Sequence, residues 1–299
     1  MQAVVHLIAL GVLMVCSLTP SLVTAELKLG VLAPRGVIQA QNQWADFASY
    51  LSDRLGQPVT LIPLGPANIV PAAEARQVDL VLANAAHMVY LQERVKGIPL
   101  ATLDGPEGPR FAGVILAKKG RGIRTIADLK GKHGMSLKFK EAAGAYIFQT
   151  YHLNQQGIDP HKDFASLREG QKQDDLVLAV QLGLIDVAFI RSGLLEAMER
   201  EGKIKIADFV IVDQRTDDGF EFVHSTDLYP EWYLSALPWV PAAVQADIKV
   251  AALQLTPDMP AAQAARVQGF IELLPLDGIQ KVLKALNIHL YDAPASRRE

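Results

Sequence analysis

The stretch Ala75-Arg-Gln-Val-Asp-Leu-Val-Leu-Ala83 places an aspartate directly before four apolar residues, after which a helical period begins at residue 85. A short apolar run between a turn and a helix is typical of a buried strand in an α/β protein. The stretch Gly183-Leu-Ile-Asp-Val-Ala-Phe-Ile190 has the same order in the second half of the chain. Two interpretations remain open: chance similarity between two ordinary strand–helix units, or two similar lobes.

The surrounding sequence continues this alternation of strands and helices, which favours a parallel α/β sheet. In the first part we expect strands at 27–32, 59–64, 79–83, 99–103 and 111–117, and helices at 39–55 and 85–95. The pattern then restarts, with a helix start at 125–128, strands at 134–137, 187–190, 206–212 and 220–224, and helices at 142–156, 174–182 and 192–201. The last expected elements are a strand at 232–237 and helices at 241–255, 261–273 and 276–286.

The C-terminal helices need a sheet to cover, and the sheet of the first part is the natural candidate. We therefore expect lobe 1 to hold residues 26–112 and 224–299, and lobe 2 to hold residues 113–223. The chain would cross between the lobes near 112–117 and return near 222–237. The prediction is an α/β fold of two lobes.

The composition is that of an ordinary globular protein: 299 residues, half of them hydrophobic, with 29 basic and 32 acidic side chains for a net charge of −3. A nucleic-acid-binding domain typically has a basic surface and a pI above about 9, whereas the sequence pI is 6.2. We therefore expect no nucleic-acid partner.

Residues 1–25 contain no Asp, Glu, Lys or Arg and carry an apolar run from Val4 to Val15, which is typical of an export signal. Cleavage after Ala25 would remove Cys16, the only cysteine. We predict a periplasmic protein with a cleaved signal peptide at 1–25. The alternative is an uncleaved N-terminal anchor, because the uncharged stretch is long enough to span a bilayer.

The sequence contains none of the G-x-S-x-G, H-E-x-x-H, Walker A or G-x-G-x-x-G motifs. Its histidines are scattered, and no two have the spacing that places metal ligands on one helix face. An enzyme of a two-lobed fold would need a nucleophile or a paired acid and base in the cleft. We predict no catalytic residue, no metal and no cofactor.

Ligand sites in open α/β sheets form at the carboxyl ends of strands, where helix N-termini point N–H groups at a ligand. The loops at these ends combine polar or basic residues with small ones, and a cleft with several basic side chains suits a small anion. The predicted ligand-binding residues are Arg35, Asn84, His87, Lys138, Gly144, Ala145, Tyr146, Arg191, His224, Ser225 and Thr226. The alternative is ordinary turn and cap chemistry in each loop and, at 224–226, a hydrogen-bonded crossover that ties the hinge.

Several segments along nearly the whole chain after residue 25 resemble the PhnD-like phosphate/phosphite/phosphonate substrate-binding proteins of ABC transporters. They include Leu29-Gly-Val-Leu-Ala-Pro-Arg-Gly36, Val78-Asp-Leu-Val-Leu-Ala-Asn-Ala-Ala-His87, Arg191-Ser-Gly-Leu-Leu-Glu196 and His224-Ser-Thr-Asp-Leu-Tyr-Pro-Glu-Trp232. Within that family the chain is most similar to the branch that also supplies the sensor region of tetrathionate-type histidine kinases.

The resemblance implies a type II periplasmic-binding-protein fold with two lobes, two hinge crossovers and a ligand between the lobes. It implies capture of a small oxyanion, either phosphate- or phosphonate-like or a sulfur oxyanion, for the membrane permease of an ABC transporter. The alternative that it implies is a ligand-sensing module that partners a sensor histidine kinase.

One segment departs from the family pattern. Where such proteins usually carry Ser or Thr beside Gly, residues 141–146 read Glu-Ala-Ala-Gly-Ala-Tyr. Each lost hydroxyl hydrogen bond to a charged group is worth roughly 1.5–3 kcal/mol. We therefore expect a ligand that is larger or softer than phosphate.

Overall fold

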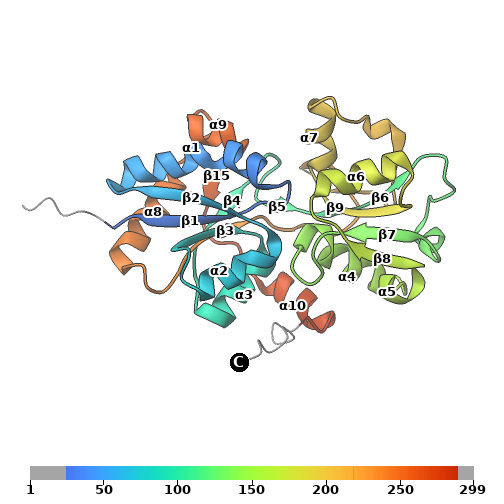
Figure 1. Cartoon of the computed structure of the whole chain (residues 1–299), viewed down its shortest axis with the longest axis horizontal. Helices are drawn as coiled ribbons and strands as arrows, with labels where there is room; N and C mark the ends of the chain where they lie inside the picture. Colours follow the sequence, from blue (N-terminus) through green and yellow to red (C-terminus); the bar gives the residue numbers. More distant parts are fainter. Residues whose placement is uncertain (1–24, 218, 289–299) are drawn as a thin grey trace, which may run out of the picture.

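The computed structural model describes residues 25–217 and 219–288, which fold around two sheets that lie side by side (Figure 1). The predicted export signal, apart from its last residue, lies outside these ranges. Within them, no helix combines the length and the hydropathy needed to cross a membrane. The α/β class predicted from the sequence is confirmed.

The first sheet has six strands in the order β15-β4-β14-β3-β1-β2. Its strands are β1 (Leu27–Leu32), β2 (Val59–Leu64), β3 (Leu80–Ala83), β4 (Ile98–Asp104), β14 (Tyr233–Ala236) and β15 (Gly269–Ile271). β1, β2 and β3 are parallel, whereas β14 is antiparallel to β3 and β4, and β15 is antiparallel to β4. The C-terminal part of the chain therefore adds two strands to the sheet that the N-terminal part begins.

Helices cover this sheet because each of them has an apolar side. α1 (Val37–Leu55), α8 (Ala242–Leu253) and α9 (Pro260–Ala265) pack together, and α2 (Ile69–Glu74) and α3 (Ala85–Val95) lie on the opposite face (Figure 1). In α1, Trp44, Phe47 and Leu51 are buried at helical spacing, as the periodicity predicts. Gly56 ends α1 in the left-handed region, which glycine adopts without strain.

The second sheet has five strands in the order β10-β6-β9-β7-β8. They are β6 (Gly113–Lys118), β7 (His133–Ser136), β8 (Ser166–Glu169), β9 (Val187–Arg191) and β10 (Phe209–Ile211). The helices that accompany them are α4 (Ile147–Gln155), α5 (Pro160–Asp163), α6 (Gln173–Leu182) and α7 (Leu194–Arg200). Here β7 is parallel to β8 and β9, whereas β6 is antiparallel to β9 and β10.

Two short segments that pair antiparallel carry the chain between the sheets: β5 (Arg110–Phe111) on the way out and β13 (Tyr229–Pro230) on the way back. The return follows a hairpin of β11 (Arg215–Asp217) and β12 (Phe220–His224). Side chains of the return segment hold the start of β6. The backbone N–H of Gly113 donates to Thr226 Oγ1 at 2.9 Å, and that of Ile115 donates to Ser225 Oγ at 3.0 Å.

The predicted helix at 261–273 is wrong in its second half. α9 ends at Ala265 because Arg266 takes a left-handed conformation, with φ 57°, and the chain then forms β15. Phe270 of β15 packs on Phe47 of α1, with 5.1 Å between the ring centroids. Pairing with the free edge of β4 and this aromatic contact outweigh the helical pattern of the local sequence.

Other elements also differ from the prediction, in which β8 and α5 are absent. The expected helix at 142–156 is a 3-10 turn, Ala143–Ala145, followed by α4 after a break at Tyr146. The expected strand at 206–212 begins with a 3-10 turn, Ile206–Asp208, before β10. α2 is absent from the prediction because Pro71 lies inside it, where proline disfavours a helix.

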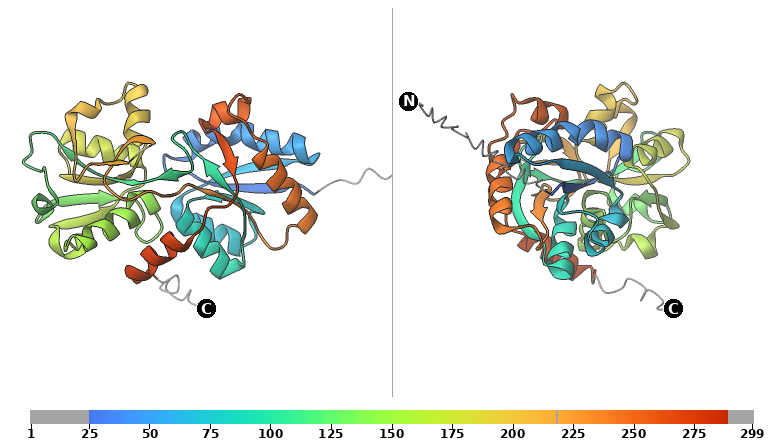
Figure 2. Two further views of the ribbon diagram at one scale, coloured as in Figure 1. Left: turned by 180° about the vertical axis from the view of Figure 1, so that it is seen from behind. Right: turned by 60° about the vertical axis from the view of Figure 1, so that its left-hand side comes forward.

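Helix α10 (Asp277–Ala285) contacts α3 beside the first sheet and α4 beside the second. Both Figure 1 and the left view of Figure 2 show it lying across the boundary between the two halves. Its buried side chains are Ile279, Val282 and Leu283, while Lys281 and Lys284 are exposed. α10 therefore bridges both halves of the molecule.

Candidate functional site

Two adjoining cavities lie between the sheets, at the carboxyl ends of β1, β3, β7 and β9. The smaller, which we call the inner cavity, has a volume of about 20 Å³, and the larger, the outer cavity, has about 400 Å³. Leu32, Pro34, Gln173, Arg191 and Trp232 belong to the walls of both. Strand ends from both sheets converge here, which is the usual position of a ligand site in an open α/β fold.

The inner cavity lies between a capped helix and a tight turn. Asn84 is the N-cap of α3, and its Oδ1 accepts hydrogen bonds from the backbone N–H groups of Ala86 at 3.0 Å and His87 at 3.1 Å. The turn Ala143–Ala145, which follows β7, lines the cavity from the other half of the molecule. Four residues singled out from the sequence, Asn84, Gly144, Ala145 and Arg191, thus lie around one small cavity.

Two buried glutamines that sequence reasoning missed support these walls. Gln149, which is fully buried, donates from Nε2 to the carbonyl oxygens of Gly144 at 2.9 Å and Ile190 at 2.8 Å. Gln173 Oε1 accepts from the backbone N–H of Arg191 at 2.8 Å, and its own backbone N–H donates to the Pro34 carbonyl at 3.2 Å across the cleft. A glutamine in an amphipathic helix has no sequence signal that distinguishes it from a surface residue.

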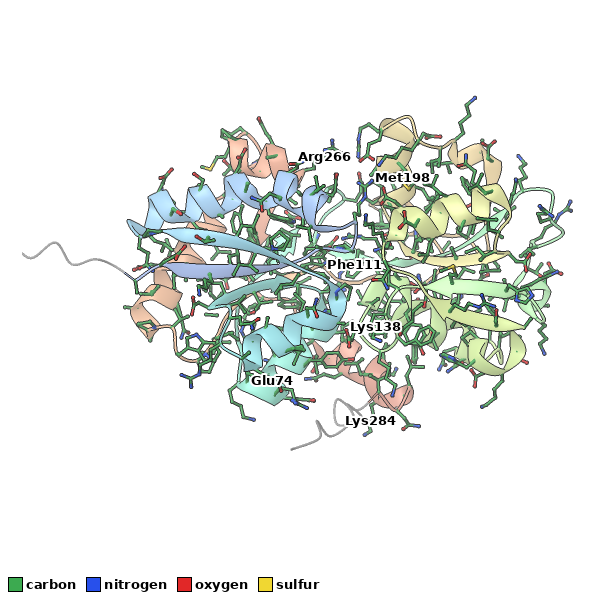
Figure 3. All side chains as sticks on the ribbon, in the orientation of Figure 1. Glu74, Phe111, Lys138, Met198, Arg266 and Lys284 are labelled. Atoms are coloured by element: carbon green, nitrogen blue, oxygen red, sulfur yellow. The ribbon has the colours of Figure 1, made fainter. Side chains whose placement is uncertain are left out.

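Arg191 lies where the two cavities join. Its Nη2 is 2.6 Å from Glu231 Oε1, and its guanidinium carbon is 4.8 Å from the centroid of the Phe111 ring, which Figure 3 shows between the two halves. The Glu231 side chain is only 3% exposed, and its Oε2 has no hydrogen-bond partner in the described part of the chain. Glu231 therefore neutralises Arg191 and holds its guanidinium in place.

Arg35 belongs to a charged cluster that joins the two halves. Its guanidinium donates to both carboxylate oxygens of Asp174, at 2.7 and 2.8 Å, and to both of Glu201, at 2.9 and 2.8 Å. Lys203 Nζ lies 3.2 Å from Asp174 Oδ2 and 2.9 Å from Glu201 Oε2. We call these four residues the ionic latch. Four of the five N–H donors of Arg35 thus bind carboxylates. Because Arg35 also lines the outer cavity, its contact with a ligand stays a prediction.

The ion pairs of the latch lower the pKa values of its two carboxylates, Glu201 and Asp174. Hydrogen bonds from Arg35, opposed by partial burial, lower the pKa of Glu201 to about 2. Burial raises the pKa of Asp174, but the hydrogen bonds and charges of Arg35 and Lys203 outweigh it, so that this pKa falls below its ordinary value. Both carboxylates are therefore ionised at neutral pH.

Three other predicted ligand residues lie outside the walls of both cavities. His87 is completely buried, with Nε2 2.9 Å from the Pro66 carbonyl, and burial lowers its pKa to about 4, so that it is neutral. Lys138 is 3.0 Å from Glu169, and the Tyr146 hydroxyl is 2.7 Å from His161 Nε2. Each of these three side chains therefore binds another residue of the protein.

The segment 224–226 is also outside both cavities. His224 is 1% exposed, with Nε2 2.8 Å from Asp217 Oδ2 and Nδ1 2.8 Å from the Phe222 carbonyl. Ser225 and Thr226 bind the backbone of β6, as described above. These contacts are those of a hydrogen-bonded crossover, the alternative interpretation, and a contact of His224, Ser225 and Thr226 with a ligand stays a prediction.

The outer cavity opens between α1 and the end of α9 on one side and α7 on the other. Trp44 and Trp232, whose stacked rings are 6.2 Å apart, form apolar parts of its wall. Two exposed arginines line it from opposite halves: Arg200 at the end of α7 and Arg266 after α9. In Figure 3, Arg266 and Met198 mark the two sides.

Comparison with known proteins gives a consistent result. The family described as "ABC transporter, phosphonate, periplasmic substrate-binding protein" matches residues 29–292. A curated relative, the tetrathionate sensor histidine kinase of Salmonella typhimurium, is 32% identical over 222 residues, which cover 72% of this chain. The matched chain spans only 37% of the length of that relative.

Solved structures share the fold. The structure of PhnD1 from Prochlorococcus marinus in complex with methylphosphonate has a TM-score of 0.74 at 17% identity, covering 88% of this chain and 98% of that one. The structure of XAC2383 from Xanthomonas citri bound to ATP has a TM-score of 0.71 at 17% identity, covering 89% and 100%. These similarities confirm the two-lobed type II periplasmic-binding-protein fold.

Proposed function

We infer that this chain, which belongs to the family of periplasmic substrate-binding proteins of phosphonate ABC transporters, captures a small oxyanion between its two lobes. The observation that carries the proposal is the inner cavity, where the N-cap of α3, the turn Ala143–Ala145 and the Arg191 guanidinium converge from both halves. Helix N-termini and arginine are favourable neighbours for an anion. We propose Asn84, Gly144, Ala145 and Arg191 as contacts of the bound group.

The proposed lobes are those expected from the sequence, residues 26–112 with 224–299 and residues 113–223, and closure of one on the other encloses the ligand. Binding of this kind requires no covalent chemistry, and the family is one of substrate-binding proteins. Within the described ranges, no group of three or more His, Cys, Asp or Glu side chains is placed to hold a metal ion. We propose that the chain is exported to the periplasm by the signal at 1–25.

We propose the permease of an ABC transporter as the membrane partner of the closed form. The similarity to a tetrathionate sensor kinase favours a second candidate function, in which the same closure is reported to a kinase. The two functions share the site and differ in the partner. Pull-down of solubilised membranes with the ligand-loaded protein distinguishes them: a permease in the bound fraction supports transport, and a histidine kinase supports sensing.

A thermal-shift screen of residues 26–299 with phosphate, methylphosphonate, sulfate, thiosulfate and tetrathionate tests the proposal. We expect at least one phosphorus or sulfur oxyanion to raise the melting temperature in a saturable way, because a ligand that binds only the folded state stabilises it. Arg191→Gln should abolish most of that shift. A screen in which amino acids or sugars stabilise the protein and oxyanions do not would contradict the proposed function.

A further inference from the structure

We propose that capture of the anion is coupled to protonation of Glu141, because closure of the cleft buries this carboxyl group between the two halves. The inference rests on the proposed function and extends it, since it assigns a regulation by pH to the same site. Glu141 begins the segment 141–146, in which the sequence departs from the family pattern. It lies outside the walls of both cavities, so it is not proposed as a ligand contact.

The loop that carries Glu141 is bound by side chains of α3 from the opposite half. The Tyr90 hydroxyl donates to the Lys140 carbonyl oxygen, and Asn84 Nδ2 donates to the Glu141 carbonyl oxygen at 3.4 Å. Tyr90 is only 2% exposed. Figure 3 shows Lys138, near the start of this loop, at the boundary between the halves. An opening of the cleft that separates α3 from the loop therefore breaks both bonds and exposes the loop to water.

The Glu141 carboxylate has no compensating partner in this contact. Its Oε2 is buried and has no hydrogen-bond partner among the residues that the structure describes. The titratable groups that face the carboxylate are Lys138, Glu169 and Tyr90. Lys138 Nζ is 3.0 Å from a Glu169 oxygen, and the Tyr90 hydroxyl donates to the Lys140 carbonyl oxygen. An ionised carboxylate is therefore poorly solvated at this position.

The sign of the coupling follows from this burial. Burial raises the pKa of Glu141 above its ordinary 4.5 and outweighs the opposing charge of Lys138. When α3 no longer covers the loop, the carboxyl group is hydrated and its pKa returns towards the ordinary value. The closed arrangement therefore binds more protons than an open one, and its advantage, full below about pH 4.5, is lost as the pH rises through the raised pKa. Closure takes up a proton from the solvent, so that acidification from neutral pH strengthens capture.

Glu196 of α7 offers a matched control. Its carboxylate is also partly buried, its Oε2 has no hydrogen-bond partner in the described ranges, and burial raises its pKa. Its Oε1 accepts from the backbone N–H of Val223 at 2.8 Å, a partner in the same half of the molecule. Closure of the cleft should therefore leave the surroundings of Glu196 unchanged.

The experiment is calorimetry with the five anions of the thermal-shift screen, at pH 5, 6 and 7 and in two buffers of different ionisation enthalpy. We expect the parent and Glu196→Gln to take up a fraction of a proton on binding, and Glu141→Gln to take up less. Because glutamine is neutral at every pH, Glu141→Gln should bind about threefold more tightly than the parent at pH 7, and by a smaller factor at pH 5. Comparison of parent and variant with the same anion cancels the protons that the anion itself exchanges.

A gain of affinity cannot arise from a variant that fails to fold, so this measurement separates regulation from a structural role of Glu141. Equal proton uptake by the parent and Glu141→Gln, a loss of affinity in Glu141→Gln at every pH, or an equal change in Glu196→Gln would overturn the coupling while the proposed function stands. Failure of all five anions to bind would overturn both.

Discussion

Arg35 is the only member of the latch in the first half, since Lys203 lies in the same half as Asp174 and Glu201. Replacing Arg35 by glutamine therefore removes every ion pair of the latch that crosses between the halves. Exposed ion pairs contribute about 0–1 kcal/mol, and breaking a buried pair costs about 3–5 kcal/mol. Arg35, Asp174 and Glu201 are 16%, 15% and 21% exposed, between these limits. We therefore expect the closed arrangement to lose about 2 kcal/mol relative to an open one, or about 30-fold in the equilibrium constant.

This loss should be visible in two measurements. If the unliganded protein is mainly open, the dissociation constant of the best oxyanion from the screen rises by the full factor, because apparent affinity scales with the fraction in the competent state. If it is mainly closed, small-angle scattering of the unliganded variant should show a larger radius of gyration than that of the parent. A matched control is Arg94→Gln, which breaks an ion pair with Glu74 inside the first lobe. If Arg35→Gln alters both quantities no more than Arg94→Gln does, the interpretation of the latch is wrong.

Three further predictions concern the same region. Hydrogen bonds from Arg35, which cross between the halves, are the largest cause that lowers the pKa of Glu201 from its ordinary 4.5 to about 2, so an arrangement that keeps these bonds binds fewer protons than one that lacks them; its advantage is present above about pH 4.5 and is lost as the pH falls towards 2, so oxyanion affinity should weaken between pH 5 and 3, and less so in Arg35→Gln. Gln149→Ala leaves buried carbonyls without a donor and should lower the free energy of unfolding in urea by about 3 kcal/mol, whereas Gln155→Ala at the exposed end of α4 should change it by less than about 0.5 kcal/mol. Arg191→Gln leaves Glu231 as a buried, unpaired charge and should lower the free energy of unfolding by about 3 kcal/mol; adding Glu231→Gln should restore part of this stability but not the affinity, and restored affinity would exclude Arg191 as a ligand contact.

The elements that the sequence predicts well are those set by local pattern. β1 and β2 have the predicted bounds, and α1 buries the predicted face, because apolar spacing determines which side of a strand or helix can enter a core. β15 and the turn Ala143–Ala145 differ from the prediction. β15 depends on the free edge of β4, which is distant in the sequence. The turn is held by Gln149, which lies only five residues after Gly144 but whose burial the helical pattern does not reveal.

The candidate site shows the same contrast between what local sequence pattern predicts and what depends on other residues. Its position at the strand ends is predictable from the fold class, but the partners of its charged residues are not. Arg35 pairs with carboxylates 139 and 166 positions away, and Arg191 pairs with one 40 positions away. A basic residue at a strand end is compatible with a ligand contact and with a latch, and only the three-dimensional arrangement distinguishes the two roles.

Helix α10 rests on α3 of one half and on α4 of the other, so a hinge rotation cannot leave both of its contacts unchanged. If the cleft opens as proposed, the helix slides on α3 or on α4, and a change inside the cleft becomes a displacement at the surface. Lys284, exposed near the end of α10, is therefore a suitable attachment point for a fluorescent reporter (Figure 3). A biosensor built on this position would read occupancy without touching the cavity.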